Sequence, residues 1–365
     1  MLRFITSLMV SVVLVAPLGC DRQGSSTGSA TGGSSATSTS APLKELRIGY
    51  FPNFTHAQAV LGVASGEFQQ AVGSTKVSTK VFNAGPSLIE ALFGDQIDIG
   101  YVGPGPALNA FAQSRGEGIR IISGAAANGV IIVARKDSGI EKLADLAGKR
   151  IASPQQGNTQ DIAAKHYVTA QLKQKDFKNV IPVQNAEQAG MMSGQQIDAA
   201  WAPEPWGSFL VSQAGGKVIG EEKDLWPQGQ FAITVVVTSP KFLADHPDVV
   251  EKVLGVHNAW TTRLTTEPDK YLPQLEQGLF ALTTKKLPAG VLKSALGYTK
   301  FTSDPLPHTF ETFAGWSFDL GFSKSRTDTK GLIDTAILQK VKSAAGAGGT
   351  PPQAPAPAAP VKEGA

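Results

Sequence analysis

The hydrophobic positions of this chain fall into short apolar stretches that alternate with helical patterns. The predicted strands are residues 46–50, 75–82, 97–102, 119–125, 130–134, 150–153, 180–183, 197–201 and 231–238. The predicted helices between them are residues 56–65, 86–94, 106–113, 140–146, 159–173, 187–192 and 206–214. Alternation of this kind predicts an α/β fold with mostly parallel sheets. Beyond residue 239 the pattern becomes helical, with helices predicted over 240–245, 247–265, 271–282, 289–296, 309–320 and 331–341.

One pattern occurs twice along the chain. GDQIDIGYVGPGPALNAF, from Gly94, is echoed by SGQQIDAAWAPEPWGSFL, from Ser193. Each copy has a glycine that ends a helix, an Ile-Asp step, a short strand and a loop rich in proline or glycine. Asn83-Ala84 is likewise echoed by Asn185-Ala186, and KELRIGYFPN by GKRIASPQQGN. The repetition predicts two similar α/β lobes across a cleft, and the alternative is a chance match of a common helix–glycine–strand pattern.

The order of the elements suggests how the lobes divide the chain. We assign residues 44–135 and 233–345 to lobe 1 and residues 136–232 to lobe 2. The strands at 130–134 and 231–238 are expected to cross between the lobes, which makes a natural hinge. Asp98 and Asp198, at equivalent strand edges, are expected to be structural partners of backbone N–H groups.

The chain's ends and its charge narrow the function classes. The 365 residues carry a net charge of only +3, and no run of Lys or Arg exceeds two residues, so we expect no nucleic-acid partner. Residues 4–15 form an apolar run after Arg3 that is too short to span a bilayer, which predicts a signal peptide over residues 1–20. Residues 21–43, rich in Gly, Ser and Thr, are expected to be a flexible tether. Residues 346–365 are expected to be a disordered Pro/Ala tail.

Cys20 is the only cysteine, so an internal disulfide is excluded. Gly19-Cys20 at the end of the predicted signal peptide resembles a bacterial lipobox, although Pro17-Leu18 matches it less well. We expect lipidation of Cys20, with ordinary cleavage as the alternative, and Asp21 resembles a signal for retention at the inner membrane. The expected location is the periplasm, anchored to the inner membrane, or the cell surface in a source without an outer membrane.

The cleft should be built from loops that follow the carboxyl ends of the predicted strands, where open α/β sheets bind ligands. These loops are residues 52–58, 85–87, 103–106, 155–159 and 201–206. Several of them precede helices, whose N-termini carry free N–H groups and the positive end of a dipole, and none contains Lys or Arg. The predicted ligand-binding residues are Asn53, Thr55, His56, Gln58, Pro86, Ser87, Gly103, Pro104, Gln156, Gly157, Asn158, Thr159, Trp201, Glu204 and Trp206.

Each of these residues has a plainer alternative role. Thr55 and Asn158 are good helix N-caps in any context, and Trp201 and Trp206 are equally suited to a core. Glu204 lies between two prolines that restrict its backbone. We expect its carboxyl group to face the ligand, where it would accept hydrogen bonds from an amine or hydroxyl or stay protonated through a raised pKa. The alternative is a solvated loop carboxylate.

Four stretches resemble the periplasmic binding proteins of ABC importers for nitrate, sulfonate, taurine and bicarbonate: LRIGYFPNFTHAQAVLGVASGEF, GDQIDIGYVGPGPALNAF, LADLAGKRIASPQQGNTQ and WAPEPWG. The resemblance covers about residues 46–238. It implies a type II periplasmic-binding-protein fold that closes on a small anionic or zwitterionic ligand and delivers it to a membrane permease driven by an ATPase. We expect a monomer that needs no cofactor or metal, and an organic sulfonate or taurine as the ligand rather than nitrate or bicarbonate.

Two other function classes remain as alternatives. The same fold includes enzymes such as pyrimidine-precursor synthases, but the five histidines are widely spaced and no cysteine follows residue 20, so no metal or nucleophile motif is present. A ligand-binding sensor would use the same binding chemistry and would need a separate signalling partner.

Overall fold

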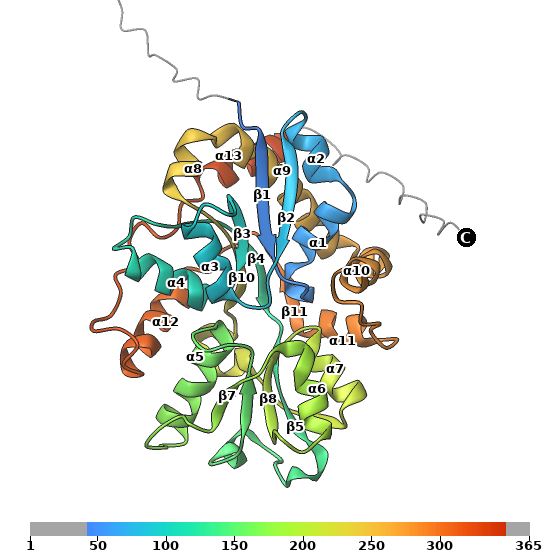
Figure 1. Ribbon diagram of the computed structural model, residues 1–365, viewed down its shortest axis with the longest axis vertical. Coiled ribbons are helices and arrows are strands. Elements are labelled where there is room, and N and C mark those ends of the chain that lie inside the picture. The colour runs from blue at the N-terminus through green and yellow to red at the C-terminus, as the bar shows by residue number, and fades with distance from the viewer. Residues whose placement is uncertain (1–41, 348–365) are drawn as a thin grey trace, which may run out of the picture. The chain divides into compact units, whose positions relative to one another are not determined.

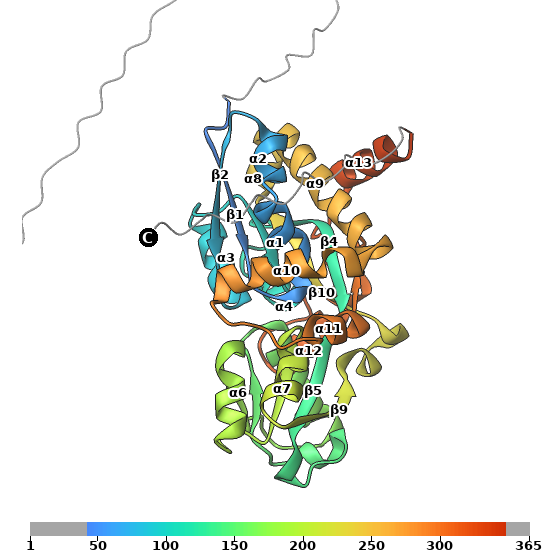
Figure 2. The same cartoon turned by 90° about the vertical axis from the view of Figure 1, so that its right-hand side faces the viewer.

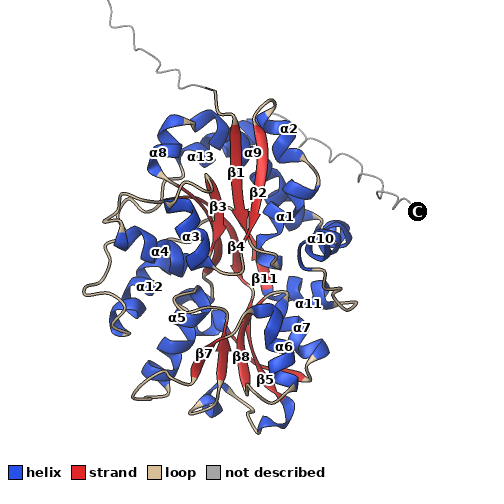
Figure 3. Cartoon of the chain, viewed as in Figure 1, coloured by secondary structure: helices blue, strands red, loops and turns tan. Residues whose placement is uncertain are grey.

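The computed structural model describes residues 42–347, and these residues form two α/β lobes (Figures 1 and 3). The predicted signal peptide and its Cys20, nearly all of the predicted tether, and residues 348–365 of the predicted tail lie outside the described residues. Within residues 42–347 no helix combines the length and the apolar character needed to cross a membrane.

The sheet of lobe 1 has the strand order β11-β4-β10-β3-β1-β2. Strand β1 pairs in parallel with β2 and β3, whereas β10 pairs antiparallel with β3 and β4. Strand β10 is buried along its whole length, as its apolar sequence AITVVVT predicts for a central strand covered on both faces. The strands are β1 (Glu45–Tyr50), β2 (Lys76–Val81), β3 (Ile99–Val102), β4 (Arg120–Asn128), β10 (Ala232–Thr238) and β11 (Thr299–Phe301).

The sheet of lobe 2 has the order β7-β6-β8-β5-β9 and repeats the same arrangement. Strand β6 pairs in parallel with β7 and β8, and β5 pairs antiparallel with β8 and β9. The parallel triplet β7-β6-β8 therefore corresponds to β2-β1-β3 of lobe 1. The strands are β5 (Val130–Arg135), β6 (Ile151–Ser153), β7 (Val180–Pro182), β8 (Ala199–Pro203) and β9 (Gly216–Glu221).

The repeated Ile-Asp step has the same structural role in both lobes. In lobe 1, Asp98 Oδ2 accepts hydrogen bonds from the backbone N (2.7 Å) and Nε (3.0 Å) of Arg47. In lobe 2, Asp198 Oδ2 accepts the same pair from Arg150, at 2.9 and 3.0 Å. These hydrogen bonds hold the pKa of Asp198 well below its usual range. The predicted role of both aspartates as structural partners of backbone N–H groups is confirmed.

The helices cover both faces of the sheets (Figures 1 and 2). In lobe 1, α9 packs against α1, α2 and α13, while α3 packs against α4 and α4 against α12. Before β4 the helices are α1 (Ala57–Ala64), α2 (Glu67–Val72), α3 (Gly85–Phe93) and α4 (Pro104–Gln113). Lobe 2 contains α5 (Thr159–His166), α6 (Asn185–Ser193) and α7 (Trp206–Gln213). The C-terminal helices are α8 (Pro240–Asp245), α9 (Pro247–Thr266), α10 (Pro268–Thr283), α11 (Val291–Tyr298), α12 (His308–Asp319) and α13 (Ala336–Ala347).

Several predicted elements differ from the structure. The helix predicted over residues 140–146 is reduced to a 3-10 turn at Leu143–Leu146, and the helix predicted over 159–173 changes to a π-helical turn at Tyr167–Gln171. The sequence pattern does not predict strands β9 and β11 or helix α2, which are present in the structure. Strand β9 is a half-exposed edge strand without an apolar run, so its position is set by pairing with β5 rather than by its own pattern.

The chain passes between the lobes at positions that differ from the predicted lobe boundary at residues 135 and 136. Strand β5 belongs wholly to the sheet of lobe 2 and β10 wholly to that of lobe 1, so neither strand spans both lobes. The chain changes sheet instead at Asn128-Gly129, which both have positive φ (60° and 73°), and at Gln230-Phe231. The two crossings are joined, because Asn128 N donates to Phe231 O (2.9 Å) and Phe231 N donates to Asn128 Oδ1 (3.2 Å). Residues 130–135 therefore move from lobe 1 to lobe 2.

Candidate functional site

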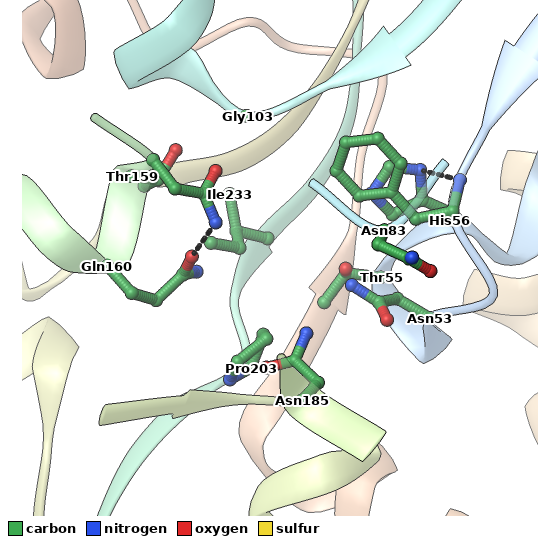
Figure 4. Close-up of a pocket in the computed structure, with 12 residues that line it drawn as sticks. Asn53, Thr55, His56, Asn83, Gly103, Thr159, Gln160, Asn185, Pro203 and Ile233 are labelled. Carbon is green, nitrogen blue, oxygen red and sulfur yellow. Dashed lines mark hydrogen bonds between the residues drawn. The ribbon is translucent and has the colours of Figure 1, made fainter. Parts of the chain in front are cut away.

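A cavity lies between the two lobes (Figure 4). Its empty volume is about 310 Å³, a figure that includes the part that opens to solvent. No lining side chain is an acid, a lysine or an arginine. The lining residues are Phe51, Asn53, Thr55, His56, Asn83, Gly103, Asn158, Thr159, Gln160, Asn185, Pro203 and Ile233.

The N-termini of α3, α4, α5 and α6 all reach this cavity. Asn83 lies just before α3, Gly103 and Asn158 are the N-caps of α4 and α5, and Asn185 is the first residue of α6. In these four helices no N-cap side chain accepts a hydrogen bond from the first turn, in contrast to α8, where Ser239 does so. The first-turn N–H groups and the positive dipole ends can therefore interact with an anion.

His56 is a neutral hydrogen-bond donor. Burial lowers its pKa to about 3, so its imidazole carries no charge near pH 7. Its Nδ1 accepts a hydrogen bond from Phe51 N (3.3 Å), which leaves the proton on Nε2 (Figure 4). The ring can therefore donate one hydrogen bond without bringing a charge into the cavity.

Four polar side chains around the cavity use an acceptor atom within the protein. Asn53 Oδ1 accepts from Trp206 Nε1 (2.8 Å), and Thr159 Oγ1 accepts from Gly105 N (3.3 Å). Gln160 Oε1 accepts from the Asn158 amide (3.0 Å), and Asn185 Oδ1 from the Gln188 amide (3.5 Å). What these residues still offer a ligand is chiefly the amide N–H of Asn53, Gln160 and Asn185 and the hydroxyl of Thr159. The cavity is therefore rich in neutral donors.

The same contacts join the lobes. Asn53 and Gly105 belong to lobe 1, whereas their partners Trp206 and Thr159 belong to lobe 2. A further cross-lobe hydrogen bond runs from Lys285 Nζ to the Ala186 carbonyl. The donor-rich cavity therefore forms where the lobes are in contact, and it would come apart if they separated.

The structure brings only some of the predicted site residues to the cavity. Those that line it are Asn53, Thr55, His56, Gly103, Asn158 and Thr159. Pro86, Gln156 and Gly157 line a neighbouring groove instead. Ser87 Oγ donates to the Ala84 carbonyl (2.9 Å), and Pro104 is buried in the first turn of α4. The predicted residues outside both spaces are Gln58, Ser87, Pro104, Trp201, Glu204 and Trp206.

Gln58 does not line the cavity, whereas Thr55 lines it but does not cap α1. Gln58 is fully buried, and its Nε2 donates to Ala125 O (2.6 Å) and Thr261 Oγ1 (3.1 Å), so its amide ties α1 to β4 and α9. Thr55 lies inside a 3-10 turn at Phe54–His56, and the N-cap of α1 is His56. The short turn shifts the start of the helix beyond the threonine.

Glu204 does not face the cavity, which corrects the prediction made from its two flanking prolines. Its side chain is fully buried, and its carboxyl group accepts hydrogen bonds from Ser208 N (3.1 Å) and Oγ (2.9 Å). The carboxyl group of Glu204 therefore binds the first turn of α7, where backbone N–H groups have no partner within the helix. Burial raises its pKa to about 7.

The two tryptophans have different structural roles. Trp201 is a core residue whose Nε1 donates to Glu222 Oε2 (2.6 Å), and Glu222 also accepts from Trp226 Nε1 (3.0 Å). Burial raises the pKa of Glu222 to about 7. Trp206 is also buried, but its hydrogen bond to Asn53 sets the orientation of a cavity amide. Trp206 is therefore a positioning residue rather than a lining residue.

Six lining residues were missed. A sequence signal existed for Asn83 and Asn185, because they occupy equivalent positions in the internal repeat, where each stands at the start of a helix. The other four depend on how the lobes meet, which the local pattern does not reveal. The missed residues are Phe51, Asn83, Gln160, Asn185, Pro203 and Ile233.

Comparison with known proteins places the chain in a family. Residues 39–270, more than half of the chain, match the NMT1-like family. The chain belongs to the NMT1-like family. A relative in Bacillus subtilis, named putative aliphatic sulfonates-binding protein, is 26% identical over 329 residues, which cover 87% of this chain and 94% of that protein.

Solved structures share the fold of this NMT1-like chain. The alkanesulfonate-binding protein of Xanthomonas axonopodis pv. citri bound to MOPS has a TM-score of 0.68 at 24% identity, covering 80% of this chain and 99% of that one. The periplasmic nitrate-binding protein of Synechocystis PCC 6803 has a TM-score of 0.70 at 14% identity, covering 83% and 89%. The predicted periplasmic-binding-protein fold is confirmed.

Across residues 42–347, no group of three or more His, Cys, Asp or Glu side chains is placed to hold a metal ion.

Proposed function

We propose that this protein is the extracytoplasmic solute-binding component of an ABC importer. In this proposal it captures a small oxyanion by closing its two lobes and delivers it to a membrane permease with its ATPase. The observation that carries the proposal is the donor-rich cavity, where neutral N–H and O–H groups and the N-termini of four helices surround a space without a lining acid. Such a set of donors suits a charge that is spread over several oxygens.

The hydrogen-bonding groups that line the cavity favour some candidate anions over others. Bicarbonate carries an O–H group that needs an acceptor, and three lining side chains, Asn53, Thr159 and Gln160, already use an acceptor atom within the protein, which disfavours it. A sulfonate or nitrate has only acceptor oxygens. We favour an organic sulfonate, taurine-like zwitterions included, because the Bacillus subtilis relative that covers most of this chain is named for aliphatic sulfonates. Since Glu204 faces away from the cavity, it gives no preference for an amine-bearing ligand.

The anchoring of the protein remains a prediction. Lipidation of Cys20 and attachment to the inner membrane rest on the N-terminal sequence alone, because those residues lie outside the described part of the chain.

A thermal-unfolding screen tests the proposed ligand class. We expect methanesulfonate and taurine to raise the unfolding temperature, because a ligand present at 100 times its Kd stabilises the folded state by about 2.7 kcal/mol. Sodium bicarbonate and sodium chloride should cause no comparable shift and serve as ionic controls. A response to nitrate alone would contradict the preference for sulfonates, and no response to any of these anions would contradict the proposed function.

Trp206→Phe tests whether the indole orients the cavity amide. The variant keeps an aromatic ring but removes the Nε1–H that donates to Asn53 Oδ1, so the amide is free to turn its oxygen toward the anion. We expect the affinity for the best sulfonate of the screen to fall roughly 5- to 150-fold, corresponding to about 1–3 kcal/mol for a lost buried hydrogen bond. Titration calorimetry gives the Kd, and Trp316→Phe, which changes an indole outside the cavity, is the matched control. Equal affinities for Trp206→Phe and the control would rule out the positioning role.

A further inference from the structure

Asp161 is a buried acid that directly follows three residues of the cavity lining. It is the third residue of α5, and Asn158, Thr159 and Gln160, which precede it, all line the cavity (Figure 4). Asp161 is fully buried and does not itself line the cavity. An unbalanced negative charge at this place would oppose the binding of an anion, because a buried charge is screened much less than an exposed one.

The carboxyl group of Asp161 fixes the loop that leads into α5. Its Oδ2 accepts a hydrogen bond from the backbone N of Gly157 (2.8 Å), the residue before Asn158. Its Oδ1 accepts a hydrogen bond from Ser153 Oγ (3.0 Å), at the end of β6. These hydrogen bonds tie the end of the strand, the loop and the first turn of the helix together. Asp161 therefore holds the backbone from which Asn158 and Thr159 reach the cavity.

Lys165 balances the charge of this carboxyl group. Its Nζ donates to Asp161 Oδ2 (2.8 Å), and the two side chains are only 6% and 1% exposed. The ammonium group also lies over the aromatic rings of Phe177 (4.9 Å to the centroid) and Phe322 (5.4 Å). Such ring contacts favour a cation in the interior. The buried pair therefore carries no net charge.

We propose that Asp161 positions the cavity loop and that Lys165 neutralises this acid, so that the acid can hold the loop without repelling the bound anion. The inference rests on the proposed function and adds two positioning residues to its site, neither of which needs to touch the ligand. Removing one member of a buried ion pair leaves an uncompensated charge. Loss of the lysine alone is therefore worse for an anionic ligand than loss of both charges together.

Four variants of the full-length protein separate the two roles. Lys165→Met leaves the carboxylate of Asp161 without its cation, and Asp161→Asn leaves the lysine without its anion. Asp161→Asn/Lys165→Met removes both charges but keeps an oxygen that can accept from Gly157 N. Asp161→Ala/Lys165→Met removes that acceptor as well. Titration calorimetry measures the Kd of each variant for methanesulfonate and taurine, and urea unfolding shows that each variant is folded.

The role of Lys165 predicts effects that depend on the charge of the ligand. We expect Lys165→Met to bind methanesulfonate about tenfold more weakly than the wild type, corresponding to about 1.4 kcal/mol. Taurine should lose less, because its ammonium group offsets part of the repulsion that its sulfonate group meets. Asp161→Asn should change the ratio of the two affinities in the opposite direction, in favour of methanesulfonate. This reverse test also holds if Lys165→Met does not fold.

The role of Asp161 predicts a difference between the two double variants. Asp161→Asn/Lys165→Met should recover most of the affinity that Lys165→Met loses, because no uncompensated charge remains. Asp161→Ala/Lys165→Met should bind methanesulfonate and taurine more weakly than the asparagine double variant, and by similar factors, because the loop has lost its acceptor. A loss that is equal for both ligands reports the position of the loop rather than its charge.

Arg263→Met is the matched control for breaking a buried ion pair. Arg263 donates to both carboxylate oxygens of Glu67 (2.8 and 2.9 Å), and the two side chains are 7% and 12% exposed. The helices that carry them, α9 and α2, contribute no residue to the cavity lining. We expect this variant to keep the wild-type Kd for both ligands.

The possible outcomes separate this inference from the proposed function. If the wild type binds methanesulfonate but Lys165→Met and Asp161→Asn leave the ratio of the two affinities unchanged, the charge balance has no role at the site. The inference is then wrong, and the proposed function still stands. Equal affinities of the two double variants would rule out the positioning role of Asp161. If the wild type binds no sulfonate, the proposed ligand class and this inference both fail.

Discussion

Gly103→Ala is expected to weaken ligand binding on the order of 100-fold while leaving the stability of the protein almost unchanged, since overpacking a contact typically costs 1–3 kcal/mol or more. A Cβ atom at Gly103 would lie 2.2 Å from Thr159 Oγ1, which belongs to the other lobe. The backbone of Gly103 is itself ordinary, with φ −72° and ψ 154°, so alanine fits within lobe 1. The clash therefore arises only when the lobes meet.

Two measurements and two controls establish this mechanism. Titration calorimetry with the best sulfonate of the screen reports the loss of affinity, and urea unfolding without ligand reports the unchanged stability. Adding Thr159→Ala to Gly103→Ala removes the clashing oxygen and should restore part of the affinity, although one hydroxyl donor is lost. Gly255→Ala, at a glycine of α9 with open space around its Cβ position, is the neutral control. Wild-type affinity in Gly103→Ala would show that ligand binding does not require this contact between the lobes.

In the wild type, Glu204 is expected to lower the free energy of unfolding as the pH rises, and Glu204→Gln should abolish this contribution. Burial raises the pKa of Glu204 from 4.5 to about 7, so between these values the folded protein holds a proton that the unfolded chain has lost. The free energy of unfolding contributed by this group therefore falls as pH rises from about 4.5 through 7. The total fall is about 3 kcal/mol at high pH, from the size of the pKa shift. Glutamine is never ionised, and it can accept from Ser208 N while donating to Ser208 Oγ.

The measurement compares urea unfolding of wild type and Glu204→Gln at pH 5 and pH 8. We expect the free energy of unfolding of the variant, relative to that of the wild type, to be roughly 2.5 kcal/mol larger at pH 8 than at pH 5, because a small part of the effect is already present at pH 5. Glu222 also has a pKa raised to about 7, but it is present in both proteins, so its contribution cancels. Glu311→Gln, at an exposed position in the first turn of α12, is the control and should show no such gain. A gain in Glu204→Gln no larger than that of this control would contradict the buried-acid interpretation.

The same variant tests where Glu204 lies relative to the ligand. In the structure its carboxyl group is held by Ser208, outside the cavity lining. We therefore expect Glu204→Gln to bind taurine and methanesulfonate as the wild type does. A selective loss of taurine would restore the role predicted from sequence, in which this carboxyl group meets the ligand's amine.

The sequence by itself determined the features that depend on neighbours a few residues away. Alternation of strands and helices predicted the α/β lobes, and the repeated Gly and Ile-Asp positions predicted two matching units with Asp98 and Asp198 at equivalent places. The loops after the strands placed Asn53, His56 and Gly103 correctly at the cavity. These predictions succeed because strand periodicity, helix termination and the position of a strand's carboxyl end are local properties of the chain.

Only the tertiary structure decided which side chains of those loops face the cavity. The sequence predicted that Glu204 would contact a ligand, but in the structure its carboxyl group accepts a hydrogen bond from the first turn of α7. Trp201 likewise lies in the core, where its indole donates to Glu222. Trp206 orients Asn53 from 153 residues away, a contact that no local pattern encodes. The direction of a loop side chain is set by competition among buried donors and acceptors brought together from distant segments, so it becomes defined only when both lobes are packed.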